Sequence, residues 1–125
     1  MFSHIMIGTN DLDRAKTFYD AVLGTLGVPP ARVDGHRIFY LTPAGIFSVS
    51  KPINGEPATY ANGGTIGFAA SSGEVADAWH AAGLANGGTT CEEPPGVREG
   101  GMGKMYLAYL RDPDGNKICA LHRMG

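Results

Sequence analysis

A few side chains that can do chemistry lie in short apolar segments of this sequence. His4 begins the apolar run HIMIG, and Cys119 lies in the run KICALH near the other end. An imidazole can act as a general base, a tyrosine such as Tyr109 can donate a proton, and a thiol is nucleophilic when a neighbouring imidazole lowers its pKa. A cysteine buried in an apolar strand is instead inert, and this interpretation is favoured for Cys119 unless His4 lies beside it.

Two stretches of the chain predict the same strand–helix order. Residues 4–8 are strand-like, and the helix that follows them places its apolar residues on one stripe: Leu12, Ala15, Phe18, Tyr19, Val22 and Leu23. Residues 65–70 are again strand-like, and the second predicted helix has its own apolar side: Val75, Ala78, Trp79, Ala82 and Leu84. Capping residues precede both helices, which supports both assignments.

Each predicted helix is followed by a predicted β-hairpin. The first hairpin joins residues 37–41 to 46–50, and the second joins 105–111 to 117–122 through the turn Asp112-Pro113-Asp114-Gly115. Residues 92–103 (EEPPGVREGGMG) are rich in turn-forming types and predict a loop.

An internal repeat follows from this order. Placing His4 on Thr65 sets an offset of 61 residues, which also places Phe18 on Trp79 and Leu23 on Leu84. We therefore predict an α+β fold with two βαβββ modules in one domain, residues 1–125. Module one covers about 1–55, a connector about 51–64, and module two about 62–125.

The composition excludes several classes of function. The chain has 125 residues with 43% hydrophobic types, enough for one modest core, and its net charge of −2 leaves no basic stripe for nucleic acid. No apolar run approaches the ~20 residues of a membrane helix, and no secretory signal is present, so we expect a cytoplasmic protein without membrane contact. The two cysteines have no CxxC spacing, which argues against a zinc knuckle or a disulfide framework.

Two sequence motifs bracket nearly the whole chain. HIMIGTNDLDRAKTFYDAVLG and RDPDGNKI resemble the opening and closing signatures of the vicinal oxygen chelate (glyoxalase/bleomycin-resistance/extradiol dioxygenase) superfamily. The resemblance implies that the two modules form a cupped mixed β-sheet around a small-molecule site, with the helices outside. It also implies a homodimer, and often one divalent metal in the cup.

The resemblance assigns four positions to metal ligands in this family: His4, Ser48, Thr65 and Cys119. Only His4 is a good ligand, because neutral hydroxyls stay protonated and Cys119 replaces the usual carboxylate. We therefore favour a pocket without a cofactor. The alternative is a divalent metal (Zn, Ni, Mn or Fe) held by His4 with unrecognised ligands, which could include the chain's other histidines: His36, His80 and His122.

Strand alternation then predicts the pocket lining. We expect Cys119 opposite Tyr109 and Ser48 opposite Tyr40, although a register shift of one residue would reverse the face. The predicted catalytic residues are His4, Tyr109 and Cys119, and the predicted substrate-binding residues are Met6, Tyr40, Ser48 and Thr65. Core packing is the favoured interpretation of Met6 and of Tyr40. Such a lining carries no fixed charge and suits a neutral or weakly polar small molecule.

Three functions remain open at this point. The favoured one is a glyoxalase-like binding protein with a degenerate metal site and slow lyase- or isomerase-type activity. The second is an active metal-dependent lyase similar to lactoylglutathione lyase, or a ring-cleaving dioxygenase. The third is a sequestering protein of the bleomycin-resistance kind, for which the sequence offers few acidic residues to meet a cationic drug. The sequence decides neither whether the protein is an enzyme nor what its substrate is.

Overall fold

Both halves of the chain fold into the same series of elements in the computed structural model, which describes residues 1–125. The first half contains β1 (His4–Gly8), α1 (Leu12–Gly24), β2 (Arg32–Asp34), β3 (Arg37–Thr42) and β4 (Gly45–Ser50). The second half contains β5 (Ile66–Ala69), α2 (Gly73–Ala85), β6 (Thr89–Thr90), β7 (Gly96–Gly100), β8 (Gly103–Arg111) and β9 (Lys117–Arg123). Residues 51–65 contain neither helix nor strand, as expected for a connector.

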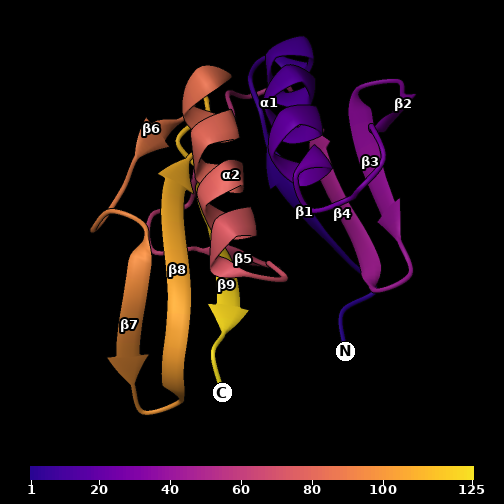
Figure 1. Cartoon of the computed structure of the whole chain (residues 1–125). Coiled ribbons are helices and arrows are strands. Elements are labelled where there is room, and N and C mark those ends of the chain that lie inside the picture. The colour runs from indigo at the N-terminus through magenta and orange to yellow at the C-terminus, as the bar shows by residue number, and fades with distance from the viewer.

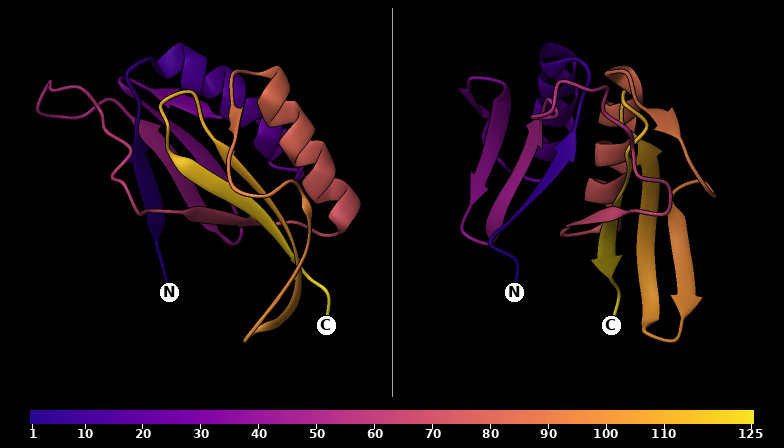
Figure 2. Two further views of the ribbon diagram at one scale, coloured as in Figure 1. Left: turned by 90° about the vertical axis from the view of Figure 1, so that its left-hand side faces the viewer. Right: turned by 180° about the vertical axis from the view of Figure 1, so that it is seen from behind.

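The two halves form two separate sheets with the same strand order. The first sheet runs β1-β4-β3-β2, and the second runs β5-β9-β8-β6, with β7 also paired to β8. In each sheet the first strand pairs in parallel with the last strand, and the other pairs are antiparallel. Both helices lie side by side on one face, and the opposite face carries no helix (Figures 1 and 2). The predicted α+β architecture of two modules with external helices is confirmed.

The sequence repeat is visible in the helix boundaries. Helices α1 and α2 begin and end at positions that are 61 residues apart. Their N-caps are also equivalent: the Asp11 side chain accepts a hydrogen bond from the Arg14 N–H, and the Ser72 side chain accepts one from the Val75 N–H. Neither helix is long and apolar enough to cross a membrane.

The structure corrects two sequence predictions in the second half. The predicted loop at 92–103 contains strand β7, because backbone pairing with β8 outweighs the high glycine content. The apolar side predicted for α2 included Ala78 and Leu84, yet Ala78 is exposed and Leu84 is 44% exposed. Gly83 is buried instead. A Cβ at this position would lie 2.2 Å from Leu110 Cδ1, so the absence of a side chain lets α2 approach β8 this closely.

One hydrophobic core joins the two modules. Its largest members come from both helices, with Phe18 and Tyr19 on α1 and Trp79 on α2, and none of the three is exposed to solvent. The rings of Phe47 on β4 and Phe68 on β5 meet edge to face across the module boundary, with centroids 5.1 Å apart. The core therefore connects sheets that have no strand pair in common.

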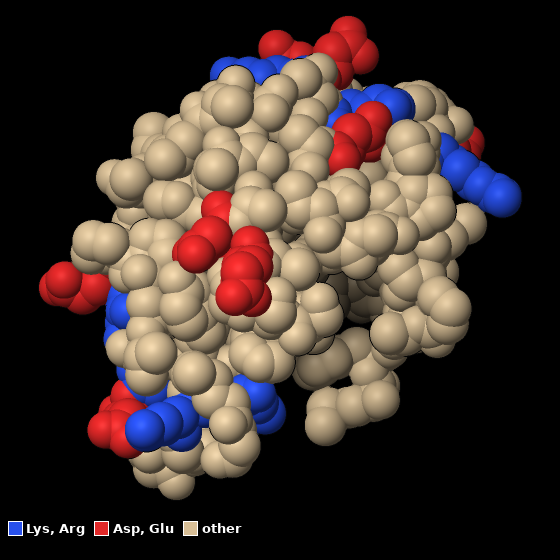
Figure 3. Space-filling model, in the orientation of Figure 1, with Lys and Arg blue, Asp and Glu red and all other residues tan.

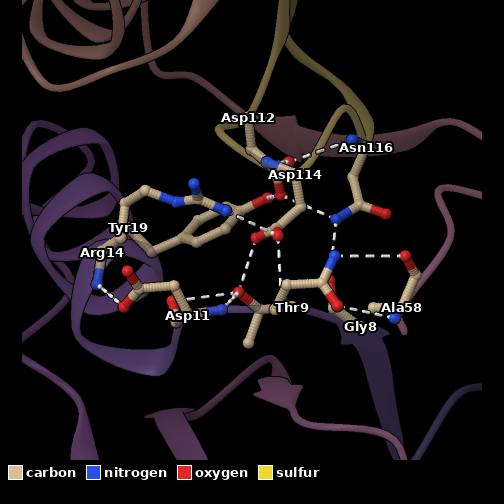
Figure 4. A network of polar contacts seen from close by, with 10 residues as sticks. Gly8, Thr9, Asp11, Arg14, Tyr19, Ala58, Asp112, Asp114 and Asn116 are labelled. Carbon is tan, nitrogen blue, oxygen red and sulfur yellow. Dashed lines mark hydrogen bonds and ion pairs between the residues drawn. The ribbon is translucent and has the colours of Figure 1, made fainter. Parts of the chain in front are cut away.

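The turn at residues 112–116, between β8 and β9, reaches across to module one (Figure 4). The Asp114 carboxylate accepts hydrogen bonds from the Thr9 hydroxyl at 2.5 Å, the Asn10 N–H at 2.9 Å and the Arg14 guanidinium at 2.8 Å. The Asn116 amide donates to the Gly8 carbonyl at 3.1 Å. These contacts attach the β8–β9 turn to the segment that links β1 to α1.

Asp112 makes the buried part of this connection. Its carboxylate accepts a hydrogen bond from the Tyr19 hydroxyl at 2.6 Å, and the backbone N–H groups of Asp114 and Asn116 donate to its other oxygen. Burial raises the pKa of Asp112, and the hydrogen bonds oppose that shift because they favour the charged form. The tyrosine of one module thus satisfies a buried carboxylate of the other.

The connector is fastened at the same place. The Asn10 side chain exchanges two hydrogen bonds with the backbone of Ala58, at 2.7 and 3.3 Å. The Arg111 guanidinium lies over the ring of Tyr60, with its central carbon 5.2 Å from the ring centroid. The same ring packs close to Gly115. Three parts of the chain that are far apart in sequence therefore meet at the 112–116 turn.

We predict that Tyr19→Phe lowers the free energy of unfolding by about 2 kcal/mol, because it removes a buried hydrogen bond to a charged group. Urea denaturation measures this change. Tyr106→Phe is the matched control, since the Tyr106 hydroxyl also donates to a carboxylate, that of Asp77 at 2.7 Å, but in an exposed environment. Equal losses for the two variants would contradict a special role for the buried bond.

The same variant has a pH signature. Burial, reinforced by Asp112, raises the pKa of Tyr19 well above its usual value. Below pH ~10 this tyrosine is protonated in both states, whereas above that pH only the unfolded chain releases the proton. Above pH ~10 the free energy of unfolding therefore falls as pH rises, and Tyr19 contributes up to about 1.4 kcal/mol per pH unit to that fall. The Tyr19→Phe variant lacks this contribution.

Candidate functional site

A cavity of about 470 Å³ opens between the two modules, below the end of α1. Its mouth is the hollow in Figure 3, and the atoms at its rim are tan, so they belong to neither basic nor acidic side chains. The walls come from β1, β4, β5, the β3–β4 hairpin, the end of α1 and the first residues of the chain. Of the 17 lining residues, 13 are hydrophobic and none is Asp, Glu, Lys or Arg.

Three aromatic rings line one side of this cavity. Tyr40 and Phe47 face the helices from neighbouring strands, with ring centroids 6.1 Å apart, and Phe47 meets Phe68 of the other module. Strand alternation separates these rings from Ser48, which follows Phe47 on β4 and points to the opposite face of the sheet, whereas Ile46 lines the cavity at the edge of that face. The cavity thus has an aromatic wall that both modules contribute.

Few polar side chains line the cavity, and most of their hydrogen bonds are already made. The Thr42 hydroxyl donates to the Gly45 carbonyl at 2.8 Å and accepts the backbone N–H groups of the same turn. The Tyr40 hydroxyl donates to Asp20 at 2.8 Å, and burial together with Asp20 raises its pKa. His4 is exposed at the cavity, and its Nδ1 lies 2.8 Å from the Ser3 hydroxyl, which leaves Nε2 without a protein partner.

Two of the three predicted catalytic residues, Tyr109 and Cys119, lie on another face. Tyr109 is directly opposite Cys119, as the sequence predicted, on the face of the second sheet turned away from the helices. Lys117, which is ion-paired with Glu92, lies 5.1 Å from the centroid of the Tyr109 ring. Burial raises the pKa of the Cys119 thiol, with Lys117 opposing and Glu92 adding to the shift, so the thiol is protonated at neutral pH.

The register of the first hairpin differs from the prediction by one residue. Ser48 is opposite Phe39, and Tyr40 is opposite Phe47, so the predicted Ser48–Tyr40 pair is wrong. The turn explains the error: Thr42 pairs with Gly45 around a two-residue loop, and the loop length sets the register of every later pair. Tyr40 consequently points to the helix side, away from the face on which Ser48 lies.

The remaining predicted residues lie around β1 and β5. Met6 pairs with Ser48 on the sheet face away from the helices, and the Ser48 hydroxyl donates to the Ile5 carbonyl at 3.2 Å. Thr65 precedes β5 and is exposed. Of the seven predicted lining residues, only His4 and Tyr40 line the cavity. Tyr109 and Cys119 are paired with each other on the second sheet, and Met6 is paired with Ser48 on the first.

The four family ligand positions do not fit a divalent metal. The Ser48 hydroxyl is used by a backbone carbonyl, Thr65 is a neutral exposed hydroxyl, and the buried Cys119 thiol is held in its protonated form. Metals of this class need deprotonated or imidazole ligands, and His4 is the only one among the four. No group of three or more His, Cys, Asp or Glu side chains in the structure could hold a metal ion.

Sequence reasoning missed most of the cavity lining. Phe47 and Phe68 are the main examples, because the family ligand positions Ser48 and Thr65 predicted the face opposite to these rings. Gly67 was also missed: it lines the cavity and pairs with Cys119. The signal was present in the alternating patterns IFSVS and TIGFAA, each of which places an aromatic ring on the helix side.

Comparisons with known proteins agree with this architecture. The crystal structure of a glyoxalase/bleomycin resistance protein from Albidiferax ferrireducens T118 is 67% identical, with 98% of each chain covered and a TM-score of 0.96. A glyoxalase-related enzyme from Fulvimarina pelagi is 18% identical, with 98% of this chain and 88% of the other covered and a TM-score of 0.75. A glyoxalase/bleomycin resistance protein/dioxygenase family enzyme from Burkholderia phytofirmans PsJN is 18% identical, with 98% of each chain covered and a TM-score of 0.74.

The family assignment rests on the sequence as well as on the fold. No curated protein matches the chain. A family model, however, matches residues 1–120, nearly the whole length. The chain therefore belongs to the glyoxalase/bleomycin resistance protein/dioxygenase superfamily.

Proposed function

We propose that this protein binds a small, largely apolar molecule in the cavity between its modules. The cavity itself supports the proposal: its volume of about 470 Å³ lies within the usual range for ligand sites, and its lining is mostly hydrophobic. Because both modules contribute walls, their relative position defines the shape of the site. A glyoxalase-like binding protein accounts for these features without requiring a strong nucleophile or a metal.

Any slow lyase- or isomerase-type step at this site would depend on His4. Such reactions move a proton, and the imidazole is the lining group that can accept or return one. The Tyr40 hydroxyl is held by Asp20, and its raised pKa makes it a poor acid. Tyr109 and Cys119 would act only on a molecule bound to the open face of the second sheet, where the protonated thiol is a weak nucleophile.

Cavity filling tests the binding proposal. N-phenyl-1-naphthylamine, an uncharged fluorescent probe, is expected to bind saturably, and Ile46→Trp is expected to weaken binding by about tenfold because the larger ring occupies the space that the ligand needs. Val33→Trp is the control, since Val33 is 61% exposed on β2 and does not line the cavity. Absence of saturable binding, or equal loss in both variants, would refute the site.

We also propose that binding needs no metal. The donor chemistry at His4, Ser48, Thr65 and Cys119 supports this, and so does the lack of a three-residue metal cluster. Purified protein is expected to contain far less than one equivalent of Zn, Ni, Mn or Fe, and to bind the probe equally well after chelation. Near one equivalent of metal that disappears in His4→Ala would disprove the proposal in favour of a metal-dependent lyase or dioxygenase.

A homodimer is the third part of the proposal. Met6 and Leu41 are 40% and 41% exposed on the face of the first sheet that no helix covers, and apolar residues on such a face favour association. Sedimentation at micromolar concentration is expected to show a dimer, which Leu41→Lys dissociates and Val33→Lys does not. A monomeric wild-type chain under these conditions would exclude the dimer.

A further inference from the structure

We infer that the cavity selects an uncharged aromatic molecule, and that the His4 imidazole supplies the hydrogen bond to the ligand's polar group. This inference rests on the proposed binding function and specifies its ligand class. Three observations support it: the absence of charged lining, the aromatic wall and the hydrogen-bonding state of each polar lining side chain.

No carboxylate, ammonium or guanidinium side chain in the lining offers a partner for a charged ligand. No acidic or basic side chain lines the cavity, and the carboxylate behind Tyr40, that of Asp20, is paired with Lys16 at 2.6 Å. Asp20 also accepts the Ala31 N–H at 3.0 Å, so its charge is compensated within module one. A carboxylate or ammonium ligand would lose its hydration shell on entering without meeting an acidic or basic lining side chain, and this cost weakens its binding.

The aromatic wall favours a planar ring. The planes of Tyr40 and Phe47 are tilted by 31° and those of Phe47 and Phe68 by 87°, so the rings of the wall have different orientations. Aromatic rings prefer offset and edge-to-face contacts with one another, which adds to the burial of apolar area. A flat aromatic ligand can make such contacts with both modules at once, whereas a flexible aliphatic chain cannot.

Only one lining side chain retains a free hydrogen-bonding atom. The Thr42 hydroxyl serves its own turn, and the Tyr40 hydroxyl donates to Asp20. The His4 ring is fixed through Nδ1 by the Ser3 hydroxyl, and its Nε2 has no protein partner. His4 pairs with Ile46, so its ring lies on the open side of the first sheet, at the edge of the cavity. A neutral polar substituent such as an amide can bond to this nitrogen there while the aromatic body of the ligand reaches between the modules to the wall.

Three naphthalenes of similar size test the inference by displacement of N-phenyl-1-naphthylamine. We expect 2-naphthamide to bind at least about tenfold more tightly than 2-naphthoate, because the carboxylate must be desolvated without a partner. We expect 2-ethylnaphthalene to fall between them. Naphthoate binding as tightly as the amide would overturn the claim of selection for uncharged ligands.

Variants at His4 test the hydrogen bond. His4→Phe keeps a ring of similar size and is expected to reduce 2-naphthamide affinity to that of 2-ethylnaphthalene, whose own affinity stays unchanged. His4→Gln supplies another hydrogen-bonding group and is expected to restore most of the amide preference. Equal losses for both ligands in His4→Phe would remove His4 from the inference.

The outcomes separate the two proposals. If N-phenyl-1-naphthylamine does not bind the wild-type protein, the proposed function itself fails. If the probe binds and Ile46→Trp weakens its binding, the cavity is a ligand site. If the three naphthalenes then bind with equal affinity or in the reverse order, the inference alone fails.

Discussion

The attachment of the 112–116 turn to module one is the constraint on which the rest of this structure depends. The two sheets have no strand pair in common, so backbone hydrogen bonding within the sheets does not set their relative position. The core and the carboxylates of Asp112 and Asp114 do so instead. A buried carboxylate is tolerated only when its hydrogen bonds are satisfied, and Tyr19 supplies one of those bonds from the opposite module. The cavity, whose walls come from both modules, keeps its shape only while this geometry holds.

Local sequence signals predicted most of the secondary structure because they act within a few residues. The capping residues expected before both helices, the helical stripe of α1 and the offset of 61 residues all agree with the structure. The turn at 112–115 was also predicted, but only as a turn. Its contacts with Thr9 and Tyr19 span about a hundred residues of sequence, and the turn sequence alone contains no information about a partner so distant. The same limit explains Gly83, whose burial depends on Leu110 in a distant strand.

The site was harder to predict because a shift of one residue in strand register changes which sheet face each side chain is expected to occupy. The sequence prediction placed Ser48 opposite Tyr40, whereas the two-residue loop of the first hairpin places Ser48 opposite Phe39. That difference moves Tyr40 from the open face of the sheet to the aromatic wall. In the second hairpin the pairing of Tyr109 with Cys119 was predicted correctly, although neither residue lines the cavity. A periodic pattern therefore predicted the strand pairing in the second hairpin, but in neither module did it identify the sheet face that lines the cavity.

The position of Cys119 shows why the chemistry of this chain is expected at the cavity and not on the open face. A Cβ on Gly67 would lie 3.3 Å from the Cys119 sulfur, so the thiol occupies the space beside the glycine on the neighbouring strand. This contact, together with burial and a raised pKa, makes Cys119 a packing residue at a position where the family often has a metal ligand. His4 is the ligand position that keeps an available nitrogen, and it lies at the cavity mouth next to a wall without charge. A site of this kind discriminates among ligands by desolvation and one hydrogen bond, which suits selective binding better than the stabilisation of a charged intermediate.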